Sequence, residues 1–343
     1  MELIVEGPGS FVGKHQGRLR VTRQGALVTE APVIHLERVL IVDRGVSISS
    51  DVVQVCAEEG IPIHFLDGLG HVHAGLYSAG LTATVVTRRA QLAAYDAPRG
   101  LALALAYMRG KIENQINMLR YAGKYRKETQ PELFEELTLI VAELRDHLHE
   151  LAELERLATQ SAATVDELRA QALSIEGRAS QRYWRMIGAL IPERLAWPGR
   201  ETRGATDAFN SLLNYGYGIL YAQIEQALVL AGLDPYGGFL HTDRPGKPSL
   251  VLDAIEEFRQ AIVDRAAIAL VNKGLEVEQA DDGRLSEGVR RRIADKIRER
   301  LEATDLYESK RHTLRIIVQS QTRHAATFLR GEREAYTPFV ASW

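Results

Sequence analysis

The sequence predicts an α+β protein of two parts: a small β-rich domain over residues 1–85 and a larger all-α domain over residues 86–343. Three observations predict this division. The chain has 343 residues, which suits about two domains of roughly 150 residues each. Short runs rich in β-branched residues occupy the first part. Long segments with the hydrophobic period of a helix occupy the second part.

The N-terminal part carries the signals of a small sheet or sandwich with one helix. Alternating or apolar runs predict strands over residues 19–23, 26–29, 39–42, 61–66 and 72–77. Gln24 and Gly25 separate the first two runs and predict the turn of a β-hairpin. Ser49 is suited to cap a short helix that runs through Cys56 and stops at Gly60.

The second part reads as a series of helices. Ala/Leu/Glu/Arg-rich segments of helical period predict helices over residues 101–125, 131–159, 165–190, 207–230, from 249 onward, 287–304 and 314–329. Asp207 is a candidate N-cap. Proline and glycine interrupt the pattern in two loops, one ending near residue 206 and one spanning residues 232–248.

Composition limits the classes of function. The formal net charge is −3, so nucleic-acid binding would have to come from local basic patches and not from a strongly positive surface. The single cysteine, Cys56, excludes a disulfide framework and a cysteine-rich metal site. The N-terminus has no secretory leader pattern, and no run approaches the ~20 apolar residues that span a bilayer. We therefore expect a cytoplasmic protein without a membrane partner.

Glu176 is the most informative single residue. On a helical wheel of residues 165–190 it falls inside the apolar sector that holds Ala172, Ala179 and Tyr183. A carboxylate on a buried stripe must be paired, protonated or bound to a metal, because an uncompensated buried charge is costly. A structural ion pair and a metal ligand are both open interpretations of this position.

His241 and the acidic residues after it form a second candidate site. His241 lies in a loop rich in glycine and proline, and such loops often approach ligands. The helix predicted from residue 249 places Asp253, Glu256 and Glu257 on one face. Their carboxylates could converge on a cation, or they could form the solvated face of an ordinary surface helix.

Taken in order, these segments resemble the CRISPR-associated integrase–endonuclease family, which inserts new spacers into a CRISPR array. The resemblance covers nearly the whole chain. It is carried by residues 41–50 (IVDRGVSISS), 59–65 (EGIPIHF), 89–95 (RAQLAAY), 110–115 (GKIENQ), 175–184 (IEGRASQRYW), 207–217 (DAFNSLLNYGY) and 238–259 (GFLHTDRPGKPSLVLDAIEEFR). Each fragment is modestly specific, whereas their order and combination are highly specific.

The resemblance implies a fold and a metal site. It implies an N-terminal β-sandwich-like domain that mainly dimerises, followed by an all-α catalytic domain. It also implies that a glutamate, a histidine and a second acid bind Mg²⁺ or Mn²⁺. Glu176 and His241 match the family motifs directly. The third ligand maps best to Glu256, the second acid of an Asp-x-x-acid pattern, with Asp253 as a supporting or alternative ligand.

The resemblance further implies an activity and partners. The activity is that of a metal-dependent DNA endonuclease and integrase of CRISPR adaptation and antiviral defence. In it a 3′-OH of the incoming DNA attacks a repeat-boundary phosphate. The implied partners are double-stranded DNA (protospacer and CRISPR repeat), a second copy of the chain, and the small second acquisition protein.

Two other functions remain open from the residues alone. One is a metal-dependent nuclease that acts on branched DNA in repair. The other is a non-catalytic helical DNA-binding scaffold in which Glu176 only pairs with an arginine. From proximity in sequence to the candidate ligands, we expect contacts with DNA phosphates from Arg182, Tyr183, Asn210 and Lys247.

Overall fold

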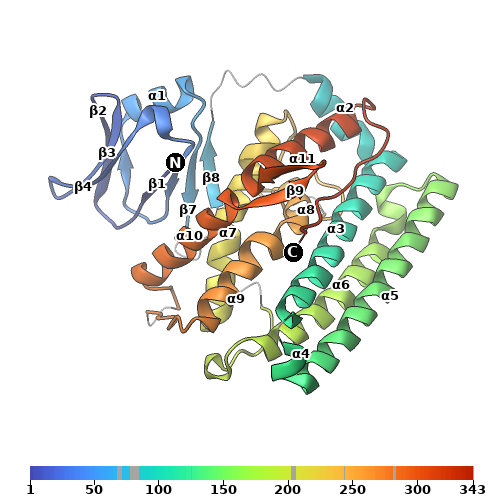
Figure 1. Ribbon diagram of the computed structural model, residues 1–343. Helices are drawn as coiled ribbons and strands as arrows, with labels where there is room; N and C mark the ends of the chain where they lie inside the picture. Colours follow the sequence, from blue (N-terminus) through green and yellow to red (C-terminus); the bar gives the residue numbers. More distant parts are fainter. Residues whose placement is uncertain are drawn as a thin grey trace.

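The computed structural model describes residues 1–67, 72–77, 85–124, 126–201, 206–242, 244–280 and 283–342. Its N-terminal part is a sandwich of two sheets, with strand orders β1-β5-β7-β8 and β4-β3-β2-β6 in the described residues (Figure 1). The strands are β1 (Glu2–Val5), β2 (Ser10–His15), β3 (Arg18–Arg23), β4 (Ala26–Pro32), β5 (Arg38–Ile41), β6 (Ser47–Ile48), β7 (Ile63–Leu66) and β8 (Val72–Leu76). Apolar side chains such as Val12, Val21 and Val39 fill the space between the sheets.

Local signals explain the predicted hairpin and helix. β3 and β4 pair antiparallel, and the turn between them places Gln24 and Gly25 at φ values of 50° and 80°. Positive φ at both central residues is the geometry that two-residue hairpins favour. Helix α1 (Ser50–Glu58) starts after Ser49, whose side chain accepts a hydrogen bond from the backbone N–H of Val52. Both predictions are confirmed.

The rest of the chain is mainly helical. Its helices are α2 (Val85–Tyr95), α3 (Pro98–Gly123), α4 (Arg126–Thr129), α5 (Pro131–Ser161), α6 (Val165–Leu190), α7 (Ala208–Leu230), α8 (Ser249–Ala254), α9 (Arg265–Asn272), α10 (Glu287–Glu302) and α11 (Leu314–Leu329). α3, α5 and α6 pack side by side, and α7 lies closer to the sandwich (Figure 1). None of the described helices is both long enough and apolar enough to span a membrane. The predicted domain boundary at residue 85 adjoins residues 78–84, which lie outside the described residues.

A short hairpin, β9 (Thr304–Tyr307) and β10 (Lys310–Thr313), adds to the all-α architecture that the sequence predicts. Its turn residues Glu308 and Ser309 have φ values of 47° and 66°. Neither is a glycine or an asparagine, so the usual hairpin signal is missing and the sequence analysis did not find this hairpin.

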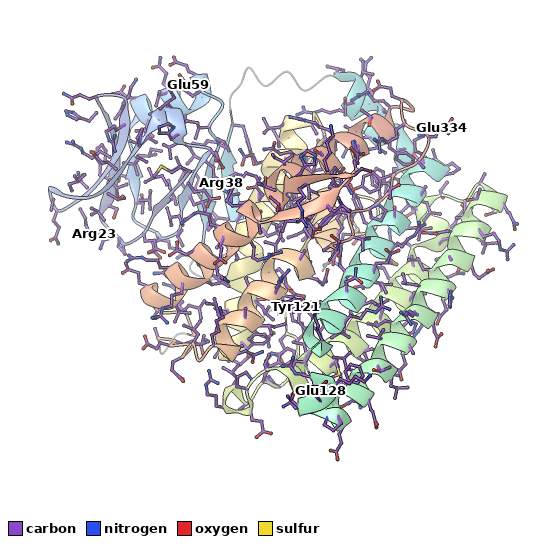
Figure 2. All side chains as sticks on the ribbon, in the orientation of Figure 1. Arg23, Arg38, Glu59, Tyr121, Glu128 and Glu334 are labelled. Atoms are coloured by element: carbon purple, nitrogen blue, oxygen red, sulfur yellow. The ribbon has the colours of Figure 1, made fainter. Side chains whose placement is uncertain are left out.

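The outer face of the β1-β5-β7-β8 sheet packs against the helices. Along β5, Val39 and Ile41 face the sandwich core, whereas Leu40 belongs to the core of the helical part. Arg38 lies at the same boundary, labelled in Figure 2, and is fully buried. Its Nε donates to Glu2 Oε1 over 2.9 Å. Arg315 on α11 lies 3.7 Å from the same Glu2 oxygen, so this network of charges, together with the apolar contact of Leu40, joins the sandwich to the helices.

A buried polar cluster crosses this boundary. The His64 side chain on β7 lies with its Nε2 3.0 Å from the Tyr77 hydroxyl and 3.7 Å from Glu225 Oε2 on α7. Burial lowers the pKa of His64 to about 3, so the imidazole is neutral at pH 7. Burial raises the pKa of Glu225 to about 7, although a hydrogen bond from Tyr77 partly offsets the rise.

Glu225→Gln is expected to change the pH dependence of stability. Between about pH 4.5 and pH 7 the folded protein holds a proton on Glu225 that the unfolded chain releases. Binding of this proton therefore stabilises the folded protein by about 3 kcal/mol below pH 4.5, and this stabilisation is lost as the pH rises through 7. We expect the free energy of unfolding of the variant, measured in urea, to gain about that much relative to the unsubstituted protein between pH 4.5 and pH 7.5.

Glu58→Gln is the matched control, because Glu58 is an exposed helical carboxylate. Its free energy of unfolding gives the baseline for the loss of one exposed carboxylate. A constant difference in free energy between Glu225→Gln and the unsubstituted protein across this pH range would contradict the assignment.

Candidate metal centre

A cleft of about 770 Å³ opens among α3, α6, α7 and the segment around residues 240–260. It contains all three of the predicted metal ligands, Glu176, His241 and Glu256. Its lining also includes basic side chains, although the whole chain carries a net charge of −3. These are Lys111, Arg200, Arg244, Lys247 and Arg259. Positive charge concentrated in a cleft attracts an anionic substrate.

Two carboxylates meet around one ammonium group in this cleft. Lys111 on α3 donates to Glu176 Oε1 on α6, and its Nζ lies 2.7 Å from Glu256 Oε2. Glu256 lies in η3 (Ile255–Glu257), a 3₁₀ turn that follows α8. Ser180 also donates to Glu176 Oε1, over 2.8 Å. Glu176 therefore forms an ion pair in this structure, and its partner is a lysine that also contacts the second candidate ligand, Glu256.

Glu256 is charged despite its burial. Burial alone would raise its pKa, but the charges of Arg259, Lys111 and His241 outweigh this effect and lower the pKa to about 2. Its Oε2 lies 2.7 Å from the Lys111 ammonium. This buried anionic oxygen is therefore paired with a positive charge whose place a metal ion could take.

Asp253 orients His241. The Asp253 side chain is fully buried, and its Oδ2 accepts hydrogen bonds from the backbone N–H groups of Phe239 (2.6 Å) and Leu240 (2.9 Å). Its Oδ1 accepts from the His241 backbone N–H (3.0 Å) and lies 2.7 Å from the imidazole Nδ1. A carboxylate can only accept, so Nδ1 donates to Asp253, and Nε2 is the ring nitrogen left for another partner. A metal-binding histidine usually has this carboxylate partner.

The segment that carries the acids is not one continuous surface helix. After α8 the chain forms η3 and then a π-helical turn, η4 (Gln260–Asp264), before α9. This corrects the prediction of one acidic face: Asp253, Glu256 and Glu257 are all buried, and they have separate partners. π-Helical turns are frequent at functional sites.

The C-terminal tail fixes this segment from behind. Glu257 accepts hydrogen bonds from the Tyr336 hydroxyl (2.6 Å), the Phe339 backbone N–H (2.6 Å) and Gln321 (3.2 Å). Burial raises its pKa to about 7 in spite of these bonds. A Cβ atom at Gly110 would lie 2.7 Å from Pro338 Cβ, so only glycine lets α3 approach the tail this closely. Adjacent acids thus have opposite tasks: Glu256 faces the cleft and Glu257 anchors the tail.

The donor set fits a divalent metal ion. Among the described residues, no three histidine, cysteine or acidic side chains converge closely enough to hold a metal as they stand. The Lys111 ammonium contacts two of the candidate side chains, those of Glu176 and Glu256. Two carboxylates with one imidazole suit an oxygen-preferring divalent ion that tolerates nitrogen. The residues present therefore fit such an ion once Lys111 moves aside.

The predicted DNA contacts separate into two groups. Lys247 lines the cleft. Arg182 points elsewhere and pairs with Glu143 on α5 over 3.0 Å. Tyr183 and Asn210 are fully buried, which contradicts the prediction that they contact DNA directly. The Tyr183 hydroxyl donates to Asp264 over 2.7 Å, so this residue belongs to the core of the helical part.

Sequence reasoning missed four cationic residues of the cleft, which are Lys111, Arg200, Arg244 and Arg259. All except Arg200 lie within segments that carry the family resemblance, but none has a spacing that reveals its partner. Lys111 and Glu176 are 65 positions apart, so only the packing of α3 on α6 brings them together.

Comparisons with known proteins agree on one family. Residues 3–330 match the family model described as CRISPR associated protein Cas1. The chain is 36% identical to a CRISPR-associated endonuclease Cas1 from Archaeoglobus fulgidus over the full length of both proteins. A casposase bound to integration product has the same fold, with a TM-score of 0.80 and 21% identity over 98% of this chain and 92% of that one. A chain of a Cas6-RT-Cas1–Cas2 complex matches with a TM-score of 0.78 and 21% identity, over 99% of this chain and 36% of the other.

Proposed function

Because the chain belongs to the Cas1 family of CRISPR-associated endonucleases, we propose that Glu176, His241 and Glu256 hold the divalent metal ion on which its activity depends. The protein is a DNA endonuclease and integrase of CRISPR spacer acquisition, a function in antiviral defence. The observation that carries the site assignment is the pair of carboxylates held around the Lys111 ammonium in a basic cleft.

Each residue of the centre has a distinct task in this proposal. Glu176 and Glu256 supply anionic oxygen ligands, and His241 supplies Nε2. Asp253 acts as a positioning residue and not as a ligand, because both its oxygens already accept hydrogen bonds. We propose Mg²⁺ or Mn²⁺ as the ion, since both prefer oxygen and Mn²⁺ accepts a nitrogen ligand well. When bound, the ion polarises a DNA phosphate and lowers the pKa of the attacking 3′-OH or water.

The residues around the centre bind and orient the DNA. The basic side chains of the cleft hold backbone phosphates, and the buried Asp253 carboxylate keeps the imidazole in one tautomer and one direction. With a DNA 3′-OH as the nucleophile the product is a joined strand. With water it is a cut strand.

The proposed partners follow from the family. They are double-stranded DNA as protospacer and CRISPR repeat, a second copy of the chain, and the small acquisition protein Cas2. A similar fold occurs in a Cas1–Cas2 complex, and this supports the last of them. We propose that residues 1–85 form the dimerisation domain and residues 86–343 the catalytic domain.

Asp253→Asn tests the positioning role. The amide has one oxygen for a site that offers three backbone N–H donors and the imidazole. We expect Mn²⁺ affinity, measured by calorimetry, to fall about ten- to hundredfold while a stoichiometric site remains. Complete loss of the site would instead make Asp253 a direct ligand, and unchanged affinity would remove it from the centre.

One assay separates integration from the alternatives. A protospacer-like duplex is incubated with a plasmid that carries a CRISPR repeat, in the presence of Mn²⁺. Joined products at the repeat boundary are expected. Nicks alone, with preferential cutting of branched DNA, would favour a repair nuclease. A chain that binds DNA but shows no stoichiometric Mn²⁺ site sensitive to Glu176→Ala would be a non-catalytic scaffold.

A further inference from the structure

Arg200 is a partly buried cation whose hydrogen-bond partners are all neutral. Its Nη1 donates to Asn210 Oδ1 over 3.0 Å and to the Glu201 backbone carbonyl, and its Nη2 donates to Asn214 Oδ1 over 2.7 Å. Among the described residues, no carboxylate accepts a hydrogen bond from Arg200 or forms an ion pair with it. A guanidinium that is largely withdrawn from water without an anion carries a desolvation cost, which a bound anion would offset.

The surroundings hold this guanidinium in place. It lies over the rings of Trp184 and Tyr217, with 5.7 Å and 5.4 Å from its central carbon to the ring centroids. Asn210, which accepts from it, is itself fixed, because its amide nitrogen donates to the Gly199 carbonyl and to Asp207. Arg200 is therefore preorganised at the cleft, so little side-chain entropy remains to be lost on binding.

A second guanidinium shares the same ring. The central carbon of Arg259 lies 4.7 Å from the Tyr217 centroid. Its only ion pair in the described residues is with Glu256, over 3.3 Å, and its buried Nε has no acceptor. Burial lowers the pKa of Arg200, and the nearby charge of Arg259 lowers it further.

A neighbouring carboxyl group, that of Asp264, is already engaged. Both oxygens of Asp264 accept hydrogen bonds from tyrosine hydroxyls, those of Tyr183 and Tyr217. Asp264 therefore acts on the two guanidinium groups only at longer range. Two like charges against one ring in the wall of a cleft are arranged to receive an anion.

We propose that Arg200 and Arg259 form a second phosphate-binding subsite, which holds the DNA backbone phosphate next to the one that reacts at the metal centre. The subsite adjoins the centre because Arg259 contacts the candidate ligand Glu256. Guanidinium forks match the geometry of phosphate oxygens, and the aromatic rings keep them oriented. This inference rests on the proposed function, since it places a DNA strand in the cleft.

Neutral phosphate analogues test the subsite directly. The DNA is a branched duplex that imitates the joined product, so that its branch point sets the register. In two versions a single methylphosphonate replaces the phosphate on one or the other side of the branch, and binding is measured by fluorescence anisotropy. One of the two replacements should weaken binding by the unsubstituted protein about ten- to hundredfold.

Arg200→Met should bind unmodified DNA about as weakly as the unsubstituted protein binds the sensitive methylphosphonate DNA. We expect its affinity for unmodified DNA to fall by a similar factor, and the sensitive methylphosphonate to cause no further loss. The slope of log Kd against log salt concentration should fall by about one. A purely structural role for Arg200 would lower thermal stability but leave the full methylphosphonate penalty, and this result would overturn the inference.

Two further variants keep the test decisive. Arg99→Met is the matched control, because Arg99 also lies over a ring, that of Phe328 at 4.8 Å, and donates to backbone carbonyls outside the cleft. It should bind all three DNAs as the unsubstituted protein does. Arg200→Lys keeps the charge without the fork and should give an intermediate loss. If Arg200→Met does not fold, the affinity of Arg200→Lys tests whether Arg200 binds the phosphate.

The two proposals fail in different ways. An unsubstituted protein that is insensitive to both methylphosphonates overturns the subsite, even if it joins unmodified DNA. A protein that shows the phosphate effect but never joins DNA keeps the subsite and loses the integrase assignment.

Discussion

Glu176→Ala is expected to slow metal-dependent DNA joining by about a thousandfold or more while the protein stays folded. The substitution removes one of two anionic ligands, and the charge stabilisation that a bound metal gives the reacting phosphate is worth several kcal/mol. The fold should survive because the Glu176 side chain is 21% exposed and Lys111 keeps Glu256 as its partner. Joining is measured in single turnover with Mn²⁺, and folding by circular dichroism.

Glu113→Ala is the matched control for this substitution. Glu113 is a half-buried glutamate on α3, the helix that also carries Lys111, but it is not among the residues that line the cleft. It should join DNA at the normal rate. Full activity of folded Glu176→Ala would remove Glu176 from the metal centre, and an equal loss in both variants would point to a general effect of α3–α6 packing.

Lys111→Met is expected to destabilise the metal-free protein by about 3–5 kcal/mol, because it leaves the buried Glu256 and the partly buried Glu176 without their shared cation. Burial would lower the pKa of Lys111, but Glu256 and Glu176 raise it, so the lysine is charged in the folded state. Added Mn²⁺ should restore most of the lost stability, since the ion takes the place of the ammonium group. Thermal melting with a chelator and with Mn²⁺ measures both effects.

Lys296→Met provides the comparison with an ordinary ion pair. Lys296 pairs with the exposed Glu299 on α10, and exposed pairs contribute about 0–1 kcal/mol. Its melting temperature should change little in either condition. A Lys111→Met variant that is equally unstable with and without Mn²⁺ would show that Lys111 has only a structural role and that the carboxylates do not bind the ion.

The fold is well predicted from sequence where local signals are strong. The bounds of α6 and α11 agree with the predicted helices, because an apolar stripe of helical period runs their full length. The helix from residue 249 is different. Its acids become buried because the C-terminal tail covers Glu257 and the loop before α8 covers Asp253. Tertiary contacts of this kind leave no periodic signal in the sequence.

The candidate site is only partly predictable for the same reason. Glu176 stands out because a carboxylate on an apolar stripe needs a partner, and this local conflict can be seen in one helix. The identity of the partner cannot be seen there, since Lys111 comes from another helix. Tyr183 and Asn210 illustrate the opposite error: they are close in sequence to the candidate site, yet one belongs to the core and the other supports Arg200.

A crystal structure with Mn²⁺, with anomalous diffraction data, tests the central claim most directly. We predict one anomalous peak at roughly 2.0–2.3 Å from a Glu176 oxygen, a Glu256 oxygen and His241 Nε2, with the Lys111 ammonium displaced from between the carboxylates. A structure in which Lys111 stays between Glu176 and Glu256 while Mn²⁺ binds elsewhere, or does not bind at all, would contradict it.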